Sequence, residues 1–343
     1  MILTLPFQRQ FHSRRRILTV LLALACACAQ TIAPTRANDS TAVLEAGGLR
    51  LTVNSGVAMV AEDLRISPHV IDIAYVFRNV GDAPVTTLVA FPLPLLPAGE
   101  PEIADALPRD GDPLNFVGFT VSVDGQPMTP AVEQRASILG LDVTDRLTAD
   151  GIPLNPFAGP AARAALTRMP KDKRDFYVRN GLAVWSGEEP LSVQWDVATS
   201  FYWQQIFPPG KDVKVLHRYL PVSGAHLMSA ADLAVPGAVE ALRRRYCIAD
   251  VDLERLRHWL APRPGGSPPQ ALRASVHYVL RTGANWAGPI GTFRLTITRP
   301  APDAIIAFCR PEGLPEGTGG VFEARDFLPR SDLSILFVRR PEP

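Results

Sequence analysis

Hydrophobic and polar residues alternate along most of the chain with a period of two. The longest example is the stretch 191–207, LSVQWDVATSFYWQQIF, whose odd-numbered positions are mostly hydrophobic. Such alternation predicts one long bent strand, or two strands in series, with one buried and one wet face. Pro208, Pro209 and Gly210 end this strand, and the following VKVLHRYLP predicts the return arm of a hairpin.

The aromatic residues within this stretch follow the same alternation. Phe201, Trp203 and Phe207 fall on the face that also carries Leu191. We therefore predict that their rings belong to the core and do not form an exposed binding platform. Tyr202 falls on the other face, so it is the aromatic residue here that we assign to a ligand surface.

Shorter segments with the same alternation recur on both sides of this hairpin, separated by turn signals such as Asp124-Gly125. Many short strands with turn-rich connections are typical of an all-β sandwich. The predicted strands cover residues 48–53, 57–66, 70–79, 85–93, 116–125, 128–136, 272–282, 292–298, 304–309, 321–327 and 333–338.

Two segments interrupt the β pattern. Residues 139–187 contain helix start and stop signals, among them Pro160 before AARAALTRM and Gly181 after KRDFYVRN. Residues 236–260 carry a second helical pattern. We therefore predict a mainly β protein with β-sandwich-type lobes, a helical insertion over about 139–187 and a second helical patch over about 236–260.

The first 37 residues have the pattern of a secretory signal peptide. A cluster of arginines that includes Arg14 and Arg15 precedes an apolar stretch, residues 17–29, and Thr35-Arg36-Ala37 forms a small-x-small cleavage site. The apolar stretch is shorter than the roughly 20 residues that span a bilayer. We predict cleavage between Ala37 and Asn38. The sequence leaves the general secretory and the twin-arginine routes both open.

Cleavage would leave 306 residues, 38–343, as a single family-level domain. The leader holds five of the 35 lysines and arginines and none of the 34 acidic residues, so the remaining chain has a net charge near −4. This charge excludes the basic surface typical of nucleic-acid binding, and no second apolar run is long enough to span a membrane. Whether the strands form one sandwich or two lobes, 38–138 and 188–343, stays open.

Two of the four cysteines, Cys26 and Cys28, lie in the leader. The remaining pair, Cys247 and Cys309, predicts a disulfide in an exported protein, because metal clusters need more ligands at closer spacing. Two separate buried thiols are the alternative.

No sequence motif for catalysis, cofactor binding or metal binding is present, so the catalytic residues are unknown and no cofactor or metal is expected. His217 and His277 lie in strand-like alternation, which favours histidines of the core or rim with satisfied hydrogen bonds. Glu62 and Asp63 are expected to be solvated strand charges, although either could join a carboxylate from elsewhere. Whether the protein is an enzyme stays uncertain.

The glycine-rich stretch TGANWAGPIGTF, residues 282–293, is the best candidate for a ligand site. Its glycines and proline hold Asn285 and Trp286 in a tight loop, where an aromatic ring beside an amide could bind a sugar or a peptide. The alternative is a structural turn whose tryptophan packs over the end of the sandwich.

Several of these segments, in the same order, resemble the bacterial family called domain of unknown function 4424. They include EDLRISP, YVFRNVGDAPVTTLVAFPLP, FVGFTVSVDGQP, FYWQQIFPPGKDVKVLHRYLP, RRRYCIAD and VLRTGANWAGPIGTFRL, and the resemblance runs from about residue 38 to 338. It implies an exported bacterial protein with no assigned activity, and it supports the cysteine pairing because both cysteines fall in family segments.

Together these features predict a soluble periplasmic or secreted protein that acts as a non-enzymatic binding or structural module. Its partner would be an envelope protein or a glycan. An envelope hydrolase or carbohydrate-active enzyme is one alternative and would need mutually close His, Asp or Glu side chains in a polar cleft. An assembly factor or chaperone is another and would show an unpaired hydrophobic edge strand.

Overall fold

The computed structural model describes residues 38–45, 48–98, 112–155, 160–186, 189–262 and 268–341. The predicted leader, including Ala37, lies outside the described residues.

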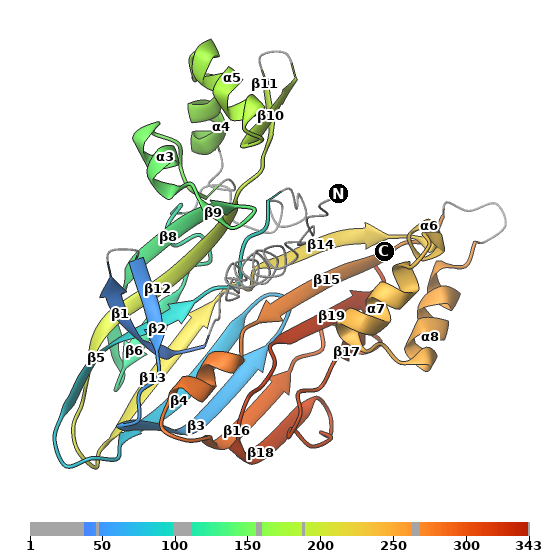
Figure 1. Ribbon diagram of the computed structural model, residues 1–343. Helices are drawn as coiled ribbons and strands as arrows, with labels where there is room; N and C mark the ends of the chain where they lie inside the picture. The colour runs from blue at the N-terminus through green and yellow to red at the C-terminus, as the bar shows by residue number, and fades with distance from the viewer. Residues whose placement is uncertain are drawn as a thin grey trace, which may run out of the picture. The chain divides into compact units, whose positions relative to one another are not determined.

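Most of the described elements are strands, which confirms the mainly β prediction (Figure 1). The strands are β1 (Ser40–Glu45), β2 (Gly48–Thr52), β3 (Val57–Ile66), β4 (Ile71–Asn79), β5 (Val85–Pro92), β6 (Thr120–Val123), β7 (Gln126–Met128), β8 (Ala131–Ile138), β9 (Leu141–Asp142), β10 (Ala183–Ser186), β11 (Glu189–Val193), β12 (Asp196–Phe207), β13 (Asp212–Tyr219), β14 (Ser223–Met228), β15 (Ala271–Tyr278), β16 (Ile290–Ile297), β17 (Ile305–Phe308), β18 (Val321–Phe327) and β19 (Leu333–Arg339). The helices are α3 (Thr144–Ala149), α4 (Pro160–Thr167), α5 (Lys171–Arg179), α6 (Ala230–Ala234), α7 (Ala238–Tyr246), α8 (Asp250–Leu260) and the 3₁₀ turn η1 (Arg281–Asn285).

The strands form three larger sheets and one two-stranded ribbon, β10-β11. The six-stranded sheet has the order β2-β1-β5-β12-β8-β9, and the seven-stranded sheet has the order β18-β16-β3-β4-β13-β6-β7. The four-stranded sheet has the order β14-β15-β19-β17. All pairings are antiparallel except that of β16 with β3, which is parallel.

The six-stranded and seven-stranded sheets pack face to face through aromatic side chains. Phe77 of the seven-stranded sheet lies 5.9 Å, ring centre to ring centre, from Phe207 of the six-stranded sheet. Phe119, just before β6, stacks on Phe201 at 4.3 Å. Edge-to-face and offset-stacked rings at these separations are favourable beyond the apolar area that they bury. The result is a β-sandwich with one continuous aromatic core.

The aromatic run is part of this core, as its alternation predicts. The stretch 191–207 forms two strands in series, β11 and β12, and β12 turns Phe201, Trp203 and Phe207 inward. Tyr202 lies on the outward face of the same strand and is partly exposed.

Strands from the early and late parts of the chain share the same sheets. β12 lies between β5 and β8, and β13 lies between β4 and β6. The six-stranded and seven-stranded sheets therefore each contain strands from both 38–138 and 188–343, whereas the four-stranded sheet contains strands of 188–343 alone. This interleaving follows from the long β12–β13 hairpin, which contributes one arm to each sheet of the sandwich.

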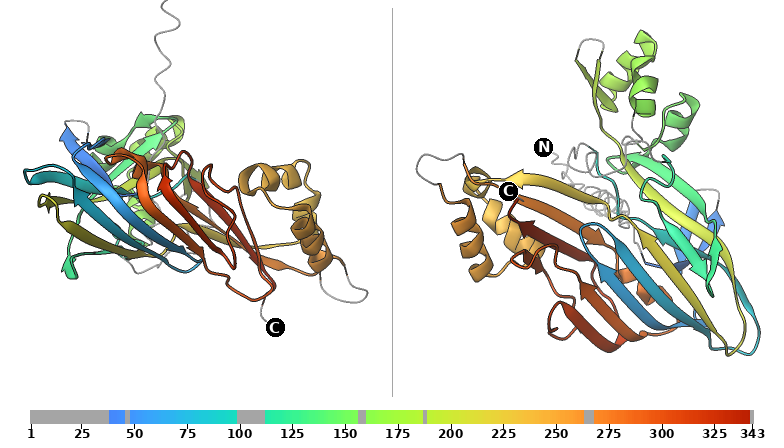
Figure 2. Two further views of the ribbon diagram at one scale, coloured as in Figure 1. Left: turned by 90° about the horizontal axis from the view of Figure 1, so that it is seen from below. Right: turned by 180° about the vertical axis from the view of Figure 1, so that it is seen from behind.

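Both predicted helical segments are present. α3, α4 and α5 form the insertion, together with the short β10-β11 ribbon. α6, α7 and α8 follow β14 and gather beside the four-stranded sheet (Figure 2). Apolar residues of α7 and α8, such as Leu242, Leu253 and Leu256, form a second core with Ile305 and Leu336 of that sheet.

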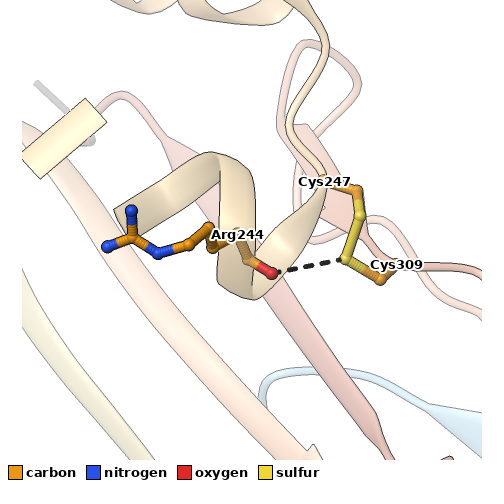
Figure 3. The surroundings of a disulfide bond; sticks show 3 residues. All are labelled: Arg244, Cys247 and Cys309. Atoms are coloured by element: carbon orange, nitrogen blue, oxygen red, sulfur yellow. Dashed lines mark hydrogen bonds between the residues drawn. A yellow bond between two sulfur atoms is a disulfide. The ribbon is translucent and has the colours of Figure 1, made fainter. Parts of the chain in front are cut away.

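The predicted disulfide between Cys247 and Cys309 joins the end of α7 to the four-stranded sheet (Figure 3). Cys247 ends α7 with a left-handed backbone, φ +49°, and Cys309 follows β17 directly. Their Cα atoms are 4.8 Å apart, within the range for an unstrained bridge. Cys309 Sγ also lies 3.8 Å from the carbonyl oxygen of Arg244. This is a contact and not a hydrogen bond, because a disulfide sulfur has no proton to donate.

Replacing Trp203 by alanine should lower the free energy of unfolding by about 3–5 kcal/mol, since it removes a large side chain that is only 6% exposed. Urea unfolding of the two proteins measures the difference. Gln204→Ala, at the exposed neighbour, is the control and should change stability by less than about 0.5 kcal/mol. An unchanged stability of Trp203→Ala would contradict the core assignment.

Replacing Cys247 by serine should lower the free energy of unfolding by about 2–4 kcal/mol, because the bridge closes a loop of 62 residues in the unfolded chain. The double variant with Cys309→Ser should be no less stable than the single one. Reductant should destabilise the natural chain and leave Cys247→Ser unchanged. Free thiols at both positions in protein from an oxidising compartment would refute the bridge.

Candidate functional site

The glycine-rich loop that the sequence singles out is a buried turn. η1 begins it, and Trp286 follows with only 2% of its surface exposed. Its ring lies 4.5 Å from that of Phe77 and 6.0 Å from that of Phe207. The tryptophan therefore packs at the core of the sandwich, which corresponds to the structural alternative considered above and leaves no exposed aromatic platform at this position.

The side chains of this loop make hydrogen bonds to an earlier segment of the same chain, Asn38–Thr41. Thr282 Oγ1 donates to the carbonyl oxygen of Asn38 at 2.9 Å, and the indole nitrogen of Trp286 donates to that of Asp39 at 2.7 Å. The Asn285 amide donates to the Ser40 hydroxyl at 2.9 Å. Asn285 and Trp286 thus hold residues that lie about 245 positions earlier in the chain.

Gly283 is required where the loop approaches this segment. A Cβ atom at residue 283 would lie 2.8 Å from the Asn38 side-chain nitrogen, closer than real contacts allow. Tyr202, the third candidate, faces outward from β12, whereas Trp286 contacts the inner face of that strand through Phe207. The structure therefore does not bring Tyr202 together with the other two residues.

Residues 38–41 are polar and yet are at most 1% exposed. Asn38 and Asp39 lie against buried polar side chains from β3, β4, β13 and β15, and we call the whole set the N-terminal cluster. Its members are Asn38, Asp39, Glu62, Tyr75, His217, Tyr219 and Tyr278.

Hydrogen bonds connect one half of the N-terminal cluster. Tyr75 donates to Asn38 Oδ1 at 2.5 Å, and Asn38 Nδ2 donates to Glu62 at 3.2 Å. Tyr278 donates to the other Glu62 oxygen at 3.3 Å, and the two tyrosine hydroxyls lie 3.2 Å apart. Glu62 is therefore a buried carboxyl group held by donors from two sides, and the expectation of a solvated strand charge is wrong for this residue.

The other half of the cluster lacks such partners among the described residues. Neither carboxyl oxygen of Asp39 accepts a hydrogen bond there, and the Tyr219 hydroxyl and both ring nitrogens of His217 also have no hydrogen-bond partner. The expectation of a satisfied hydrogen bond therefore fails for His217. His277 does have contacts, with Ser334 and Arg245 at 2.9 Å each.

Burial sets the protonation of both acids. It raises the pKa of Asp39 well above its usual value, and the negative charge of Glu62 raises it further. Burial also raises the pKa of Glu62 to about 8, although hydrogen bonds from Asn38 and Tyr278 oppose the shift. No described lysine or arginine contributes to either shift. The Asn38 nitrogen is uncharged as long as it is in the peptide bond to residue 37. The cluster then contains two acids and no lysine, arginine or amino-terminal charge.

His217 is neutral in this surrounding. Its ring is packed among Tyr75, Phe91, Phe119 and Trp203 at centre-to-centre distances of 4.9–5.6 Å, and burial lowers its pKa to about 3. The distance of 3.7 Å between His217 Nε2 and Asp39 Oδ2 would fit an ion pair. Burial of both groups nevertheless favours their neutral forms, since the charged forms lose their hydration.

The acids, the histidine and the tyrosines of this arrangement are all buried, each at most 3% exposed. Across the described ranges, no group of three or more His, Cys, Asp or Glu side chains is placed to hold a metal ion. One sequence signal could have revealed Glu62, because this residue shares the period-two phase of Leu64 and Ile66, which face the core.

The outer face of the seven-stranded sheet carries an open polar groove of about 700 Å³. Arg65 pairs with Asp63 at 3.0 Å and Arg218 pairs with Asp72 at 3.4 Å along its walls. Other lining residues include Thr120, Ser122, Pro127, Leu216 and, although its side chain is buried, His217. None of the residues that line the groove is tyrosine, phenylalanine or tryptophan.

Comparison with known proteins places the chain as follows. A family model described as "Domain of unknown function (DUF4424)" matches residues 37–336. A crystal structure from Legionella pneumophila, described as that of a "putative nutrient binding protein", aligns with a TM-score of 0.39 at 16% identity, over 89% of this chain and 72% of that chain. A likeness of this size gives no information about function. No curated protein matches the chain.

The neutral state of His217 makes stability depend on pH. The unfolded histidine binds a proton below about pH 6.5, whereas the folded one does not until about pH 3, so the contribution of His217 to the free energy of unfolding should fall as the pH drops through this window, by at most about 1.4 kcal/mol per pH unit. The raised pKa values of Asp39 and Glu62 act in the opposite direction, so the contribution of His217 is the difference between the natural chain and a variant without this histidine. Urea unfolding between pH 7 and pH 4 measures it.

His217→Phe keeps an aromatic ring that cannot be protonated, so it should lack this contribution, and the slopes of the two proteins should differ by up to about 1.4 kcal/mol per pH unit. His69→Gln, at an exposed histidine, is the control and should leave the slope unchanged. Equal slopes in the natural chain and in His217→Phe would show that His217 is protonated in the folded state.

Proposed function

The chain belongs to the family of domain of unknown function DUF4424, and we propose that it is exported from the cytoplasm and acts outside it as a non-enzymatic binding module. The polar groove of the seven-stranded sheet is the binding surface in this proposal. The observation that carries the proposal is the division of polar groups between the two faces of that sheet. The groups suited to acid–base chemistry point inward and are buried, while paired charges point outward into an open groove.

Two features support export. The first is the signal-peptide pattern of residues 1–37, with its small-x-small site before Asn38. The second is the Cys247–Cys309 disulfide, because such bridges form and persist in oxidising compartments and are rare in the cytoplasm. None of the helices in the described ranges is long and apolar enough to cross a membrane.

The chemistry of the groove favours a segment of an envelope protein over a glycan. Asp63 and Asp72 alternate with Arg65 and Arg218, so both signs of charge are offered side by side. A polypeptide segment with its own charged side chains can exchange partners with these ion pairs, and complementary charges of this kind set specificity and association rate. The groove offers no aromatic ring on which a sugar could stack.

A second candidate function, that of an assembly factor, is favoured by the edge of the four-stranded sheet. β14 is an edge strand of that sheet, and its Leu227 is 52% exposed. An apolar groove of about 330 Å³ lies beside it, lined by residues that include Leu220, Pro221 and Leu272. An unpaired edge next to apolar surface can accept an added strand from another protein.

Site-directed crosslinking tests the two candidates. A photoreactive amino acid placed at Thr120, in the polar groove, should crosslink to a polypeptide in living cells that export the protein. The same residue at Gln204, on the outer face of the six-stranded sheet, is the control and should give little product. Arg65→Glu combined with Arg218→Glu should abolish the product at Thr120, because it removes the positive charges of the groove.

The outcomes separate the proposals. Adducts at Leu227 without adducts at Thr120 would favour the assembly factor. Adducts at Thr120 that contain sugar and no peptide would overturn the choice of partner. Absence of adducts at both positions, in protein shown to be exported, would contradict a binding role for these surfaces.

A further inference from the structure

Asn38 occupies an unusual position for a residue next to a predicted cleavage site. A residue beside a processing site is ordinarily exposed, yet Asn38 and Asp39 have no exposed surface. The backbone of the segment is held at consecutive residues by Thr282 and Trp286, and the Asn38 side chain is held by Tyr75 and Glu62. The chain is therefore buried from residue 38 onward, and both its backbone and the Asn38 side chain are hydrogen-bonded.

The surroundings of Asn38 are acidic or electron-rich. Glu62 lies against its side chain at 3.2 Å, and the Leu280 carbonyl oxygen lies 3.4 Å from the same Asn38 nitrogen. Asp39 follows directly in the chain, with a carboxyl group that accepts no hydrogen bond from any described residue. A buried carboxylate without a donor or a cation is costly, and this cluster contains two carboxyl groups. A positive charge at residue 38 would supply what the arrangement lacks.

We propose that cleavage before Asn38 creates a buried α-ammonium group that serves as the internal counter-ion of Asp39 and Glu62, so that removal of the leader completes the folded core. This inference rests on the proposed export of the chain. The site it assigns is an N-terminus-binding site, formed by the 281–286 loop and the N-terminal cluster, whose ligand is the protein's own new N-terminus.

The chemistry of the step is simple hydrolysis. Water adds to the carbonyl carbon between Ala37 and Asn38, and the carbon–nitrogen bond breaks. Ala37 leaves with a carboxylate that contains the water oxygen, and the Asn38 nitrogen takes up both protons of the water to become an ammonium group. One neutral peptide N–H is thereby replaced by a group with three N–H donors and a full positive charge. It belongs to the residue whose side-chain nitrogen lies against Glu62 and the Leu280 carbonyl oxygen, and which directly precedes Asp39 in the chain.

The effect of the charge can be separated from that of steric fit. The described structure holds Asn38 as part of an ordinary peptide bond, so an acyl group on its nitrogen is accommodated. A chain in which this nitrogen stays acylated should therefore fold in the same way and lack only the counter-ion. Inserting Gly-Ser-Gly-Ser between Ala37 and Asn38 provides such a chain, because cleavage after Ala37 then leaves the ammonium group four residues away from Asn38.

The experiment compares the two exported proteins after their N-termini are identified by mass spectrometry. The natural protein should begin at Asn38 and should melt at a temperature higher by about 5 °C or more than that of the protein with the insertion. Its α-amino group should also react with an amine-acylating reagent at least about tenfold more slowly in the native state, since the group is buried and protonated.

The double variant Asp39→Asn, Glu62→Gln is the matched control. It removes both negative charges while keeping the shape of both side chains, so the melting temperatures of its natural and extended forms should agree within about 1 °C. If this variant does not fold, the reactivity of the α-amino group in the natural protein decides the matter. Equal melting temperatures and equal reactivities of the natural and extended chains would overturn the proposal.

Failure of the proposal can be distinguished from failure of export. If the leader is retained or is cut elsewhere, mass spectrometry shows it, and the proposed function is then in doubt. The counter-ion is tested separately with a chain in which a protease exposes Asn38 in vitro before oxidative refolding. In that preparation a protected α-amino group supports the buried site, and a freely reactive one refutes it.

Discussion

The fold depends on the insertion of Asn38–Thr41 between the sheets of the sandwich. This segment contacts η1 and the residues after it, and its last two residues begin β1, which pairs with β2 and β5. The side chains that receive it come from β3, β4, β13 and β15. Elements from the beginning, middle and end of the chain therefore meet at one four-residue segment, and the six-stranded and seven-stranded sheets are joined there by polar contacts as well as by apolar packing.

These polar contacts carry an energetic cost that the surrounding core must offset. Asp39, Glu62 and His217 would all lose hydration if they were charged in the interior, and each charged form is disfavoured for that reason. The stacked and edge-on rings of Phe91, Phe119 and Phe201 surround the cluster with close packing. The disulfide acts elsewhere, in the second core, where it ties α7 to the four-stranded sheet. The N-terminal cluster and the disulfide thus lie in different parts of the molecule.

Much of the fold was predictable from local patterns. Alternation of hydrophobic and polar residues predicted β12 and its inward aromatic residues, because that pattern depends on neighbours in sequence. The two cysteines after the predicted leader suggested the disulfide, because an exported protein meets an oxidising compartment. β1 and β14 were missed, since STAVLE and SGAHLM lack a clean alternation. Glu62 was misjudged because a charged residue in a strand is ordinarily exposed. Its phase matches that of Leu64 and Ile66, and the bulge between Met59 and Ala61 puts it out of phase with Val57 and Met59. The partner of the 281–286 loop depends on contacts across about 245 residues, which no local pattern contains.

The buried cluster and the exposed groove are two sides of the same strands. On β3, Glu62 points inward and its neighbour Asp63 points outward, and on β13 His217 points inward and Arg218 points outward. Because side chains alternate between faces, a shift of one residue in strand register would place the charges of the groove in the core and the cluster on the surface. Contacts to Asn38 and Asp39 hold the inward residues and thereby fix this register. The contacts of the N-terminal segment therefore also bear on where the outer ion pairs lie.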